Sequence, residues 1–237
     1  MRKAFVICLV LLIVFGGIAI AGDIIGRRVA QNEIAKNVAS QYDLDHTPDV
    51  SIKGFPFLTQ ALDGRYGEID INVGDLTQQG IRLTDTKVAL KGVTAPMSDA
   101  MNGDSSKMVA DSATSTATIG YDDVNKSAPN NMKVSAAGSN LQVRGPYTVP
   151  GLGITRTVTA TVSVQPSGRS VRVVPQSVKT GGTTVPLSLV RQAFTFTMSV
   201  KGLPLNTRIT GVKVQPQGLR VSTTAQNVKL DSLNVVH

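Results

Sequence analysis

Few side chains of this 237-residue chain are of the types that carry out catalysis, and they are scattered. The chain contains two histidines, His46 and His237, and one cysteine, Cys8. A serine nucleophile requires a base such as histidine, and the sequence contains no G-x-S-x-G turn to present such a serine. The sequence therefore argues against a serine hydrolase. One cysteine also excludes a disulfide framework.

Three carboxylates lie close to His46 in the sequence and raise the question of a metal site. Asp43, Asp45 and Asp49 share a polar segment with it, but their spacing lacks the glycine and the terminal glutamate of a calcium-binding loop. Two histidines, one of them at the end of the chain, do not supply a multi-histidine site. We predict no metal site and no other cofactor.

Two further patterns match catalytic or cofactor motifs only in part. Asp122 and Asp123 are adjacent carboxylates, but adjacent side chains diverge, so capping of a helical turn is the expected role. Gly151-Leu152-Gly153 lacks the third glycine of a dinucleotide-binding loop and follows a proline, which indicates a turn. We therefore expect a protein that is not an enzyme.

The stretch Gly54-Phe55-Pro56-Phe57-Leu58-Thr59-Gln60 concentrates apolar side chains, with two of the chain's six Phe residues. Pro56 fixes its own φ and biases Phe55 towards an extended backbone, so we expect a sharp turn or the start of a strand, with both rings on one side. Two interpretations remain open. The rings either fill the core, as large apolar residues usually do, or line a cavity for an apolar ligand.

A second bulky stripe follows late in the chain. Phe194, Phe196, Met198 and Val200 alternate with smaller or polar residues, which predicts that they line one face of a strand. From both stretches we predict an apolar cavity, with a filled core as the alternative for each residue. The predicted ligand-binding residues are Phe55, Phe57, Leu58, Phe194, Phe196 and Met198.

The elements that must position these residues follow from hydrophobic periodicity. Residues 23–42 repeat apolar side chains every three to four positions, which predicts an amphipathic helix that Asp23 caps. This helix is expected to pack on a sheet rather than to lie on a bilayer. Period-two alternation predicts roughly ten strands after it, and Pro186 marks the start of a short second helix at 187–193.

Helix and strands together predict an α+β fold, with an antiparallel sheet curved strongly around the long N-terminal helix. One long helix does not cover every apolar strand face. The remainder must be covered by curvature of the sheet, by its closure towards a barrel, or by a ligand.

The N-terminal segment is an apolar leader. Arg2 and Lys3 precede an uncharged run, Ala4 to Gly22, which predicts that residues 1–22 are a signal peptide or a membrane anchor. Ala19-Ile20-Ala21 would allow cleavage after Ala21. In either case residues 23–237, predicted as a single domain, lie outside the cytoplasm.

The formal net charge of +8 favours an anionic partner. The basic residues are dispersed and the chain has no Trp, so no basic and aromatic patch for nucleic acid is recognisable. We expect an anionic membrane surface instead, and no nucleic acid.

The heptad at 54–60, together with the preceding helical pattern, resembles the LmeA-like phospholipid-binding family of actinobacterial cell-envelope proteins. The resemblance spans about Asp23 to Leu230. Shorter sequence motifs that support it are Pro48-Asp49-Val50, Lys91-Gly92-Val93, Gly202-Leu203-Pro204 and Gly218-Leu219.

This resemblance implies a fold similar to the tubular lipid-binding proteins, with an elongated apolar cavity. It also implies phospholipid ligands, including the phosphatidylinositol type, and a part in assembling lipomannan-type envelope glycolipids. The leading hypothesis is an extracytoplasmic protein of the envelope or periplasm that binds or transfers phospholipid. The alternative is an anchored, non-catalytic envelope scaffold that presents its sheet edges to partner proteins.

Overall fold

The computed structural model describes residues 2–96, 106–126, 128, 131–148, 155–180, 183–199 and 207–230. Within these ranges, the side chains of residues 2–15, 180, 183–185, 189, 190, 193 and 199 are not described. The chain forms two compact units. Unit 1 comprises Met1–Asn72, Ala89–Ala113 and Asn227–His237, and unit 2 comprises Val73–Val88 and Thr114–Gln226.

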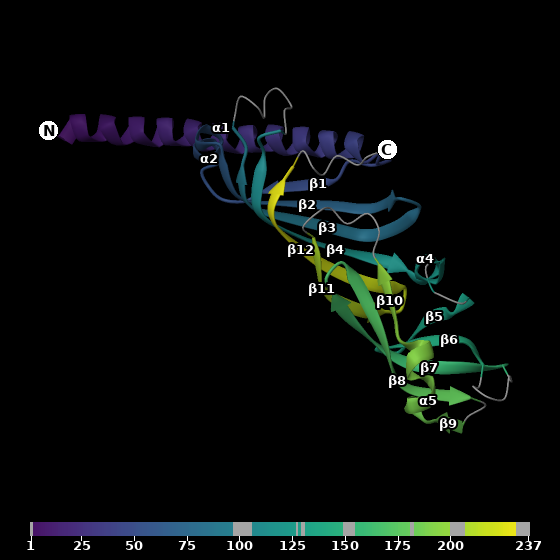
Figure 1. The fold of residues 1–237 in the computed structure, drawn as a ribbon. Coiled ribbons are helices and arrows are strands. Elements are labelled where there is room, and N and C mark those ends of the chain that lie inside the picture. Colours follow the sequence, from purple (N-terminus) through teal and green to yellow (C-terminus); the bar gives the residue numbers. More distant parts are fainter. Residues whose placement is uncertain are drawn as a thin grey trace. The chain divides into compact units, whose positions relative to one another are not determined.

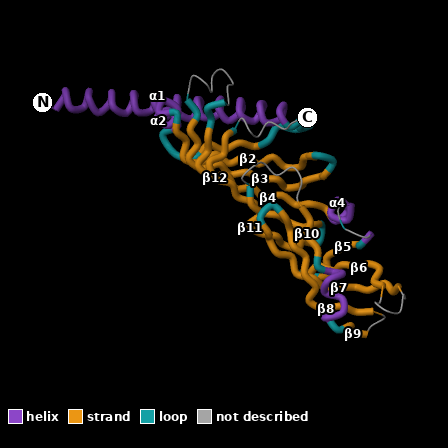
Figure 2. Tube along the Cα trace, viewed as in Figure 1, coloured by secondary structure: helices purple, strands orange, loops and turns teal. Residues whose placement is uncertain are grey.

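Helix α1 (Arg2–Gln41) is a single uninterrupted helix (Figure 2). The first proline of the chain is Pro48, so no residue before it is barred from a helix interior. The sequence predicted this helix only from Asp23, which therefore lies inside α1 and does not cap it. Ala35 is buried, and the amide of Gln31 donates a hydrogen bond of 2.7 Å to the Val50 carbonyl. This part of α1 thus packs on a strand, as expected.

The elements after α1 are mostly strands, and a few short helices lie between them (Figure 1). In chain order they are β1 (Asp49–Ile52), α2 (Phe57–Asp63), β2 (Arg65–Gln78), β3 (Ile81–Thr94), β4 (Val109–Gly120), α4 (Tyr121–Lys126), β5 (Lys133–Ala137), β6 (Asn140–Thr148), β7 (Thr155–Ser167), β8 (Ser170–Thr180), β9 (Thr183–Val185), α5 (Leu187–Phe194), β10 (Phe196–Ser199), β11 (Arg208–Gln215) and β12 (Gly218–Lys229).

The first sheet has the strand order β1-β2-β3-β4-β12-β11. β1 pairs antiparallel with β2, and β11 pairs antiparallel with β12. β2, β3, β4 and β12 each contribute residues to both units. β2 continues through Gly74 as far as Gln78, and β4 begins at Val109.

The second sheet has the order β10-β8-β7-β6-β5, and β9 also pairs with β8. The registers of all its pairs are antiparallel. β5 and β6 form a hairpin in which Ala137 faces Asn140. Gly145 and Pro146 lie within β6.

The apolar face of the second sheet is buried inside unit 2. α5 contacts β6 and β8, α4 contacts β5, and β11 contacts β7 and β8. These contacts enclose a hydrophobic core. The second sheet, α4, α5 and β12 of the first sheet all contribute residues to it. Its buried members are Val124, Met132, Val134, Leu141, Val143, Val158, Ala160, Val162, Val173, Val178, Phe194 and Leu219.

Unit 1 buries apolar side chains of α1, α2 and the strands that pack on them. α2 and β1 both contact α1. The buried residues of this unit include Ala35, Val50, Ile52, Phe57, Ala61, Ile69, Leu90, Val93, Ala95, Ala110 and Val228.

The described structure therefore confirms the α+β class, the N-terminal helix, the antiparallel pairing and the short helix that follows Pro186. Both sheets have free edges and are not closed. Where the structure describes side chains, no helix is long and apolar enough to cross a membrane.

Candidate functional site

The heptad at 54–60 forms a tight turn followed by α2. The Phe55–Pro56 peptide bond is cis, Gly54 has a φ of 93°, and Pro56 precedes the first residue of the helix. Gln60 joins the parts of the turn. Its amide group donates to the Lys53 carbonyl at 3.2 Å and accepts from the backbone N–H of Gly67 at 3.2 Å. The heptad therefore forms the sharp turn that was one of the two expectations, and this turn leads into a helix rather than into a strand.

The start of α2 is held by a carboxylate from α1. Pro56 gives α2 no side-chain cap, but the backbone N–H of Leu58 donates to Asp23 Oδ1 at 2.8 Å. Asp23 is 2% exposed and also accepts a hydrogen bond from Arg27 at 3.2 Å. Carboxylates stabilise a helix N-terminus by accepting its free N–H groups. Asp23 thus caps α2, not the helix that contains it.

The three site residues predicted in the heptad have different environments. Phe57 is 5% exposed, and its ring centroid lies 6.2 Å from that of Tyr66. Phe55 is 66% exposed and Leu58 is 40% exposed. The expectation that both rings lie on one side of the chain was therefore wrong. One ring is part of the core of unit 1, and the other faces solvent.

The other three predicted site residues lie at the junction of α5 and β10. Phe194 is the last residue of α5 rather than a strand residue, and it is fully buried in the core of unit 2. Phe196 and Met198 lie on β10 opposite Val173 and Val171 of β8, and both are half-buried against that core. Val200 lies outside the described residues. The backbone change after Phe194 interrupts the predicted stripe.

The six predicted residues thus divide equally between the units, with Phe55, Phe57 and Leu58 in unit 1. Their role as the lining of a lipid cavity remains a prediction. Of the six, Phe55, Leu58, Phe196 and Met198 retain exposed surface that a ligand can reach, whereas Phe57 and Phe194 are almost fully enclosed.

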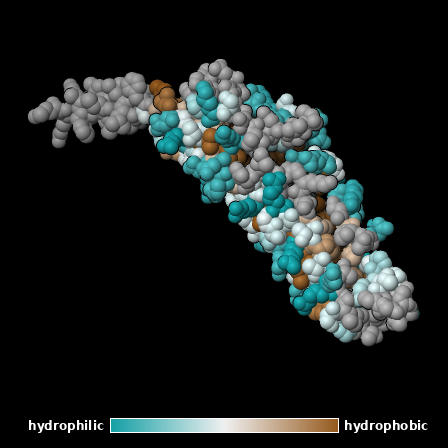
Figure 3. All heavy atoms as spheres, in the orientation of Figure 1, coloured by the Kyte–Doolittle hydropathy of each residue, from teal (hydrophilic) through white to brown (hydrophobic). Residues whose placement is uncertain are grey.

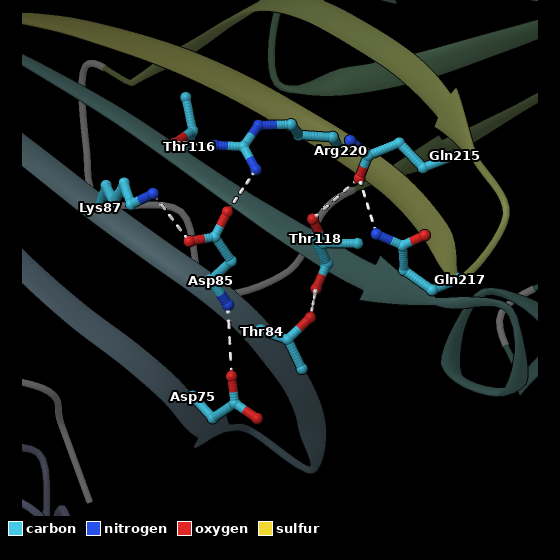
Figure 4. Close-up of polar contacts among 9 residues, drawn as sticks. All are labelled: Asp75, Thr84, Asp85, Lys87, Thr116, Thr118, Gln215, Gln217 and Arg220. Atoms are coloured by element: carbon cyan, nitrogen blue, oxygen red, sulfur yellow. Dashed lines mark hydrogen bonds and ion pairs between the residues drawn. The ribbon is translucent and has the colours of Figure 1, made fainter.

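A polar network crosses β3, β4 and β12 within unit 2 (Figure 4). Asp85 accepts a hydrogen bond from Arg220 at 2.5 Å and pairs with Lys87 at 2.9 Å. Arg220 also donates to the Thr116 hydroxyl at 3.1 Å. Because Asp85 faces two cations, this cluster has one positive charge in excess.

The network continues along the same strands through neutral groups. The Thr84 hydroxyl donates to the Thr118 carbonyl at 3.3 Å, and the Thr118 hydroxyl donates to Gln215 at 3.4 Å. These bonds link strands that are far apart in the sequence. They support a structural role for the threonines on these faces.

Hydrogen bonds set the shifted carboxyl pKa values in unit 2. The bond from Arg220, and then that from Lys87, lowers the pKa of Asp85 below its ordinary value. The bonds from Lys126 and from the backbone N–H of Arg82 lower the pKa of Asp123, and Asp123 in turn raises the pKa of Lys126.

The shifted phenol pKa values have another cause, which is burial. Burial disfavours the charged form of a phenol. It raises the pKa of Tyr42, Tyr66 and Tyr121. The Tyr121 hydroxyl donates to the Gln215 carbonyl at 2.8 Å.

The residues considered for catalysis or metal binding have ordinary roles where they are described. Asp123 pairs with Lys126 at 2.6 Å and accepts from the Arg82 backbone at 3.1 Å. It therefore fixes β3 rather than capping its own helix. His46 lies 3.5 Å from the exposed carboxylate of Asp45. Gly151-Leu152-Gly153, Gly202-Leu203-Pro204 and His237 lie outside the described residues, as does the side chain of Cys8.

Among side chains that the structure describes, no three His, Cys, Asp or Glu residues gather in a group able to hold a metal ion.

Comparison with protein families gives one match that covers most of the chain. The model of the LmeA-like phospholipid-binding family matches residues 21–224. The chain belongs to the LmeA-like phospholipid-binding family. Comparisons with curated proteins and with solved structures find no significant match. Membership of this LmeA-like family confirms the resemblance inferred from the heptad and supports phospholipid as the class of ligand.

The sequence did not reveal the roles of two residues close to the heptad of this LmeA-like chain. Asp23 was assigned to its own helix, and its bond to Leu58 spans 35 residues, which no local pattern reveals. Leu62 was not singled out, although it follows Leu58 by four positions and is 77% exposed. The i, i+4 spacing was the available signal.

Proposed function

We propose that this protein binds phospholipid outside the cytoplasm by enclosing acyl chains among apolar side chains. The observation that carries the proposal is the family match over residues 21–224, which includes residues of both units. Phospholipids of the phosphatidylinositol type are the proposed ligands. The protein carries out no catalysis in this proposal. It transfers lipid or supports the assembly of lipomannan-type glycolipids in the cell envelope.

The proposed acyl contact in unit 2 is β10. This short strand lies at the edge of the second sheet, and its Phe196 and Met198 are half-buried against the core. An acyl chain that displaces water from these side chains gains about 0.8 kcal/mol for each methylene group that it buries. The fully buried Phe194 belongs to the core against which the other two side chains pack. It would contact lipid only if the core of unit 2 opened.

The headgroup contributes orientation and selectivity in this proposal. A lipid phosphate is favoured by Lys and Arg side chains, and the cluster of Lys87, Asp85 and Arg220 has one cation in excess. We assign the headgroup to basic residues of this kind at the opening of the apolar site.

The proposed location rests on the leader. We propose that residues 1–22 act as a signal peptide cleaved after Ala21 or as an anchor that holds the chain at the envelope membrane. The open, mostly antiparallel sheets are compatible with a tubular lipid-binding arrangement, which is part of the proposal.

Uptake of a fluorescent phospholipid tests the acyl site. Phe196→Asp places a charge beside the core at the edge strand and is expected to reduce uptake at least tenfold while the protein remains folded. The matched control is Thr197→Asp, because Thr197 is on the same strand but exposed. Equal uptake by both variants would contradict the proposed site. Unfolding of Phe196→Asp alone would assign Phe196 to a filled core instead.

One observation favours the scaffold alternative. Exposed apolar side chains, Phe55 and Leu58 among them, gather on unit 1, and such surfaces often bind other proteins. A scaffold would retain its partners in a pull-down when lipid uptake is abolished. A lipid-binding protein would instead lose its function together with uptake.

A further inference from the structure

Large exposed apolar side chains are concentrated in one region of unit 1. Among the described residues, those found exposed are all within 18–62: Ile18, Ile20, Ile24, Ile25, Val29, Phe55, Leu58 and Leu62. We call these eight residues the α1–α2 apolar surface. The space-filling view shows brown, hydrophobic atoms gathered on α1 close to α2 (Figure 3). Single exposed apolar residues are common, but a concentration of this kind usually marks an interaction site.

The α1 part of this surface extends around the helix. Ile18, Ile25 and Val29 follow at intervals of seven and four residues, which places them on one face. Ile20 and Ile24 lie on the other side of the helix axis, and they are 50% and 44% exposed. A protein partner covers one face of a helix. Apolar side chains around most of the circumference are typical of a helix in an apolar surrounding.

The α2 part of the surface is fixed against α1. Leu58 and Leu62 share one face of α2, while Phe57 and Ala61 occupy the buried face. The bond from Leu58 N–H to Asp23 holds the start of α2 on α1. At Gly26, a Cβ would lie 3.4 Å from a methyl carbon of Leu58, so the two helices approach closely there. Specific contacts within unit 1 therefore hold the α2 part of the surface in place.

Two features identify an anionic lipid layer as the partner. The surface continues, on the same helix, the uncharged run from Ala4 to Gly22. Basic residues also outnumber acidic ones beside it, by four to three: Arg27, Arg28, Lys53 and Arg65 against Asp23, Asp63 and Asp70, which pairs with Lys53 at 3.2 Å. Arg28 is exposed and makes no ion pair with any residue that the structure describes. Cations next to exposed apolar side chains are attracted to anionic headgroups.

We propose that the α1–α2 apolar surface docks into the interfacial layer of an anionic phospholipid membrane. Phe55, Leu58 and Leu62 insert among the acyl chains, and Arg28 lies at the level of the phosphates. The proposal rests on the proposed function, because docking gives the protein access to the lipid that it binds. If the leader is cleaved after Ala21, Ile18 and Ile20 are removed with it, and the remaining residues still form the surface.

Tryptophan fluorescence tests the proposal directly, because the natural chain contains no Trp. Leu62→Trp places a reporter on the surface. Ser40→Trp is the matched control, on the exposed side of α1 about 16 Å beyond Val29 at 1.5 Å per residue. Both full-length variants are placed in nanodiscs of phosphatidylglycerol and phosphatidylcholine with brominated acyl chains. Bromine quenches only a Trp that reaches the acyl layer.

The expected result is at least threefold stronger quenching of Leu62→Trp than of Ser40→Trp. Equal quenching of the two variants would overturn the proposal. A blue-shifted but unquenched Leu62→Trp would also overturn it, because a second copy or another protein would then cover the surface.

A second arm tests the charge. Adding Arg28→Glu to Leu62→Trp is expected to weaken quenching at least twofold in discs that contain phosphatidylglycerol, and to leave it unchanged in pure phosphatidylcholine. The same quenching in all discs would overturn the assignment of an anionic partner.

A third arm separates docking from lipid uptake. Leu62→Trp is combined with Phe196→Asp, which is designed to block the acyl site of unit 2. Quenching that persists after uptake is lost supports docking as an independent property. If wild-type protein takes up no lipid but Leu62→Trp is quenched, the proposed function fails and the docking surface remains. Loss of quenching with normal uptake overturns the docking surface alone.

Discussion

Asp23 shows how one side chain determines the local arrangement of unit 1. Its carboxylate is buried within α1, and it accepts hydrogen bonds from Leu58 of α2 and from Arg27. A buried acceptor of this kind leaves its donors unpaired when it is removed, and the cost then exceeds that of the lost bond alone.

Asp23→Ala is therefore expected to lower the free energy of unfolding by about 1–3 kcal/mol. The reason is that Leu58 N–H and the Arg27 guanidinium lose their partner in a largely buried position. Urea denaturation measures this change. Asp63→Ala, at the exposed end of α2, is the control and should stay within about 0.5 kcal/mol of wild type. Equal effects of the two substitutions would contradict the capping role of Asp23.

Asp85 predicts a pH dependence of stability. Its pKa is lower in the folded protein because Arg220 and Lys87 bind its ionised form. Its stabilising contribution is therefore fully present above the unfolded-state pKa of the carboxyl, near 3.8, and is lost as the pH falls through the lower folded-state value. Asp85→Asn should flatten the dependence of stability on pH in this acidic range. Melting temperatures between neutral and acidic pH measure it.

The control for this prediction is Asp43→Asn, an exposed carboxylate in unit 1. Its pH profile should follow that of the wild-type protein. If Asp85→Asn also retains the full acid dependence, the network around Arg220 does not contribute as described.

At the level of elements, hydrophobic periodicity predicted most helices and strands. It did not show where the pattern of buried positions shifts from one strand to the next. Val134 and then Leu141 and Val143 are buried, and these positions differ by an odd number of residues between the two strands. That change of parity marks the hairpin between β5 and β6, which alternation alone does not separate into two strands. Ile25 and Val29 belong to the apolar pattern that predicted the helix at 23–42, yet they are exposed at 62% and 63%.

The site was less predictable than the fold, because exposure of the heptad depends on distant contacts. The pattern singled out both Phe55 and Phe57, but it did not distinguish the exposed ring from the buried one. The bond from Leu58 N–H to Asp23 holds the start of α2 on α1, and Phe57 lies on the buried face of α2. This contact spans 35 residues, so no local spacing encodes it.

Truncation of the two rings of the heptad is expected to lower the stability of the protein by very different amounts. Phe57→Ala removes a ring that is 5% exposed, and it should cost about 3–5 kcal/mol of stability through the cavity that it leaves. Phe55→Ala should cost less than about 0.5 kcal/mol, because the ring faces solvent. Thermal or urea unfolding of both variants checks this pair. Comparable losses would show that Phe55 is also part of the core.

For the whole molecule, the central question is what covers the apolar strand faces. The sequence argument was that one long helix is not enough, and that curvature of the sheet, its closure towards a barrel, or a ligand covers the rest. The structure shows that α4, α5, β11 and β12 cover much of the second sheet within unit 2. Among the described residues, the edge strand β10 carries half-buried apolar side chains, and the α1–α2 apolar surface carries exposed ones. These are the two places that we propose for contact with phospholipid.

Native mass spectrometry of protein purified from its own membranes tests this account most directly. The account predicts a copurified phospholipid, seen as an added mass of one lipid per chain, which is replaced when a second phospholipid is supplied. Phe196→Asp should lose this mass and Thr197→Asp should keep it. A folded protein that carries no phospholipid, and that acquires none when it is offered, would contradict the account.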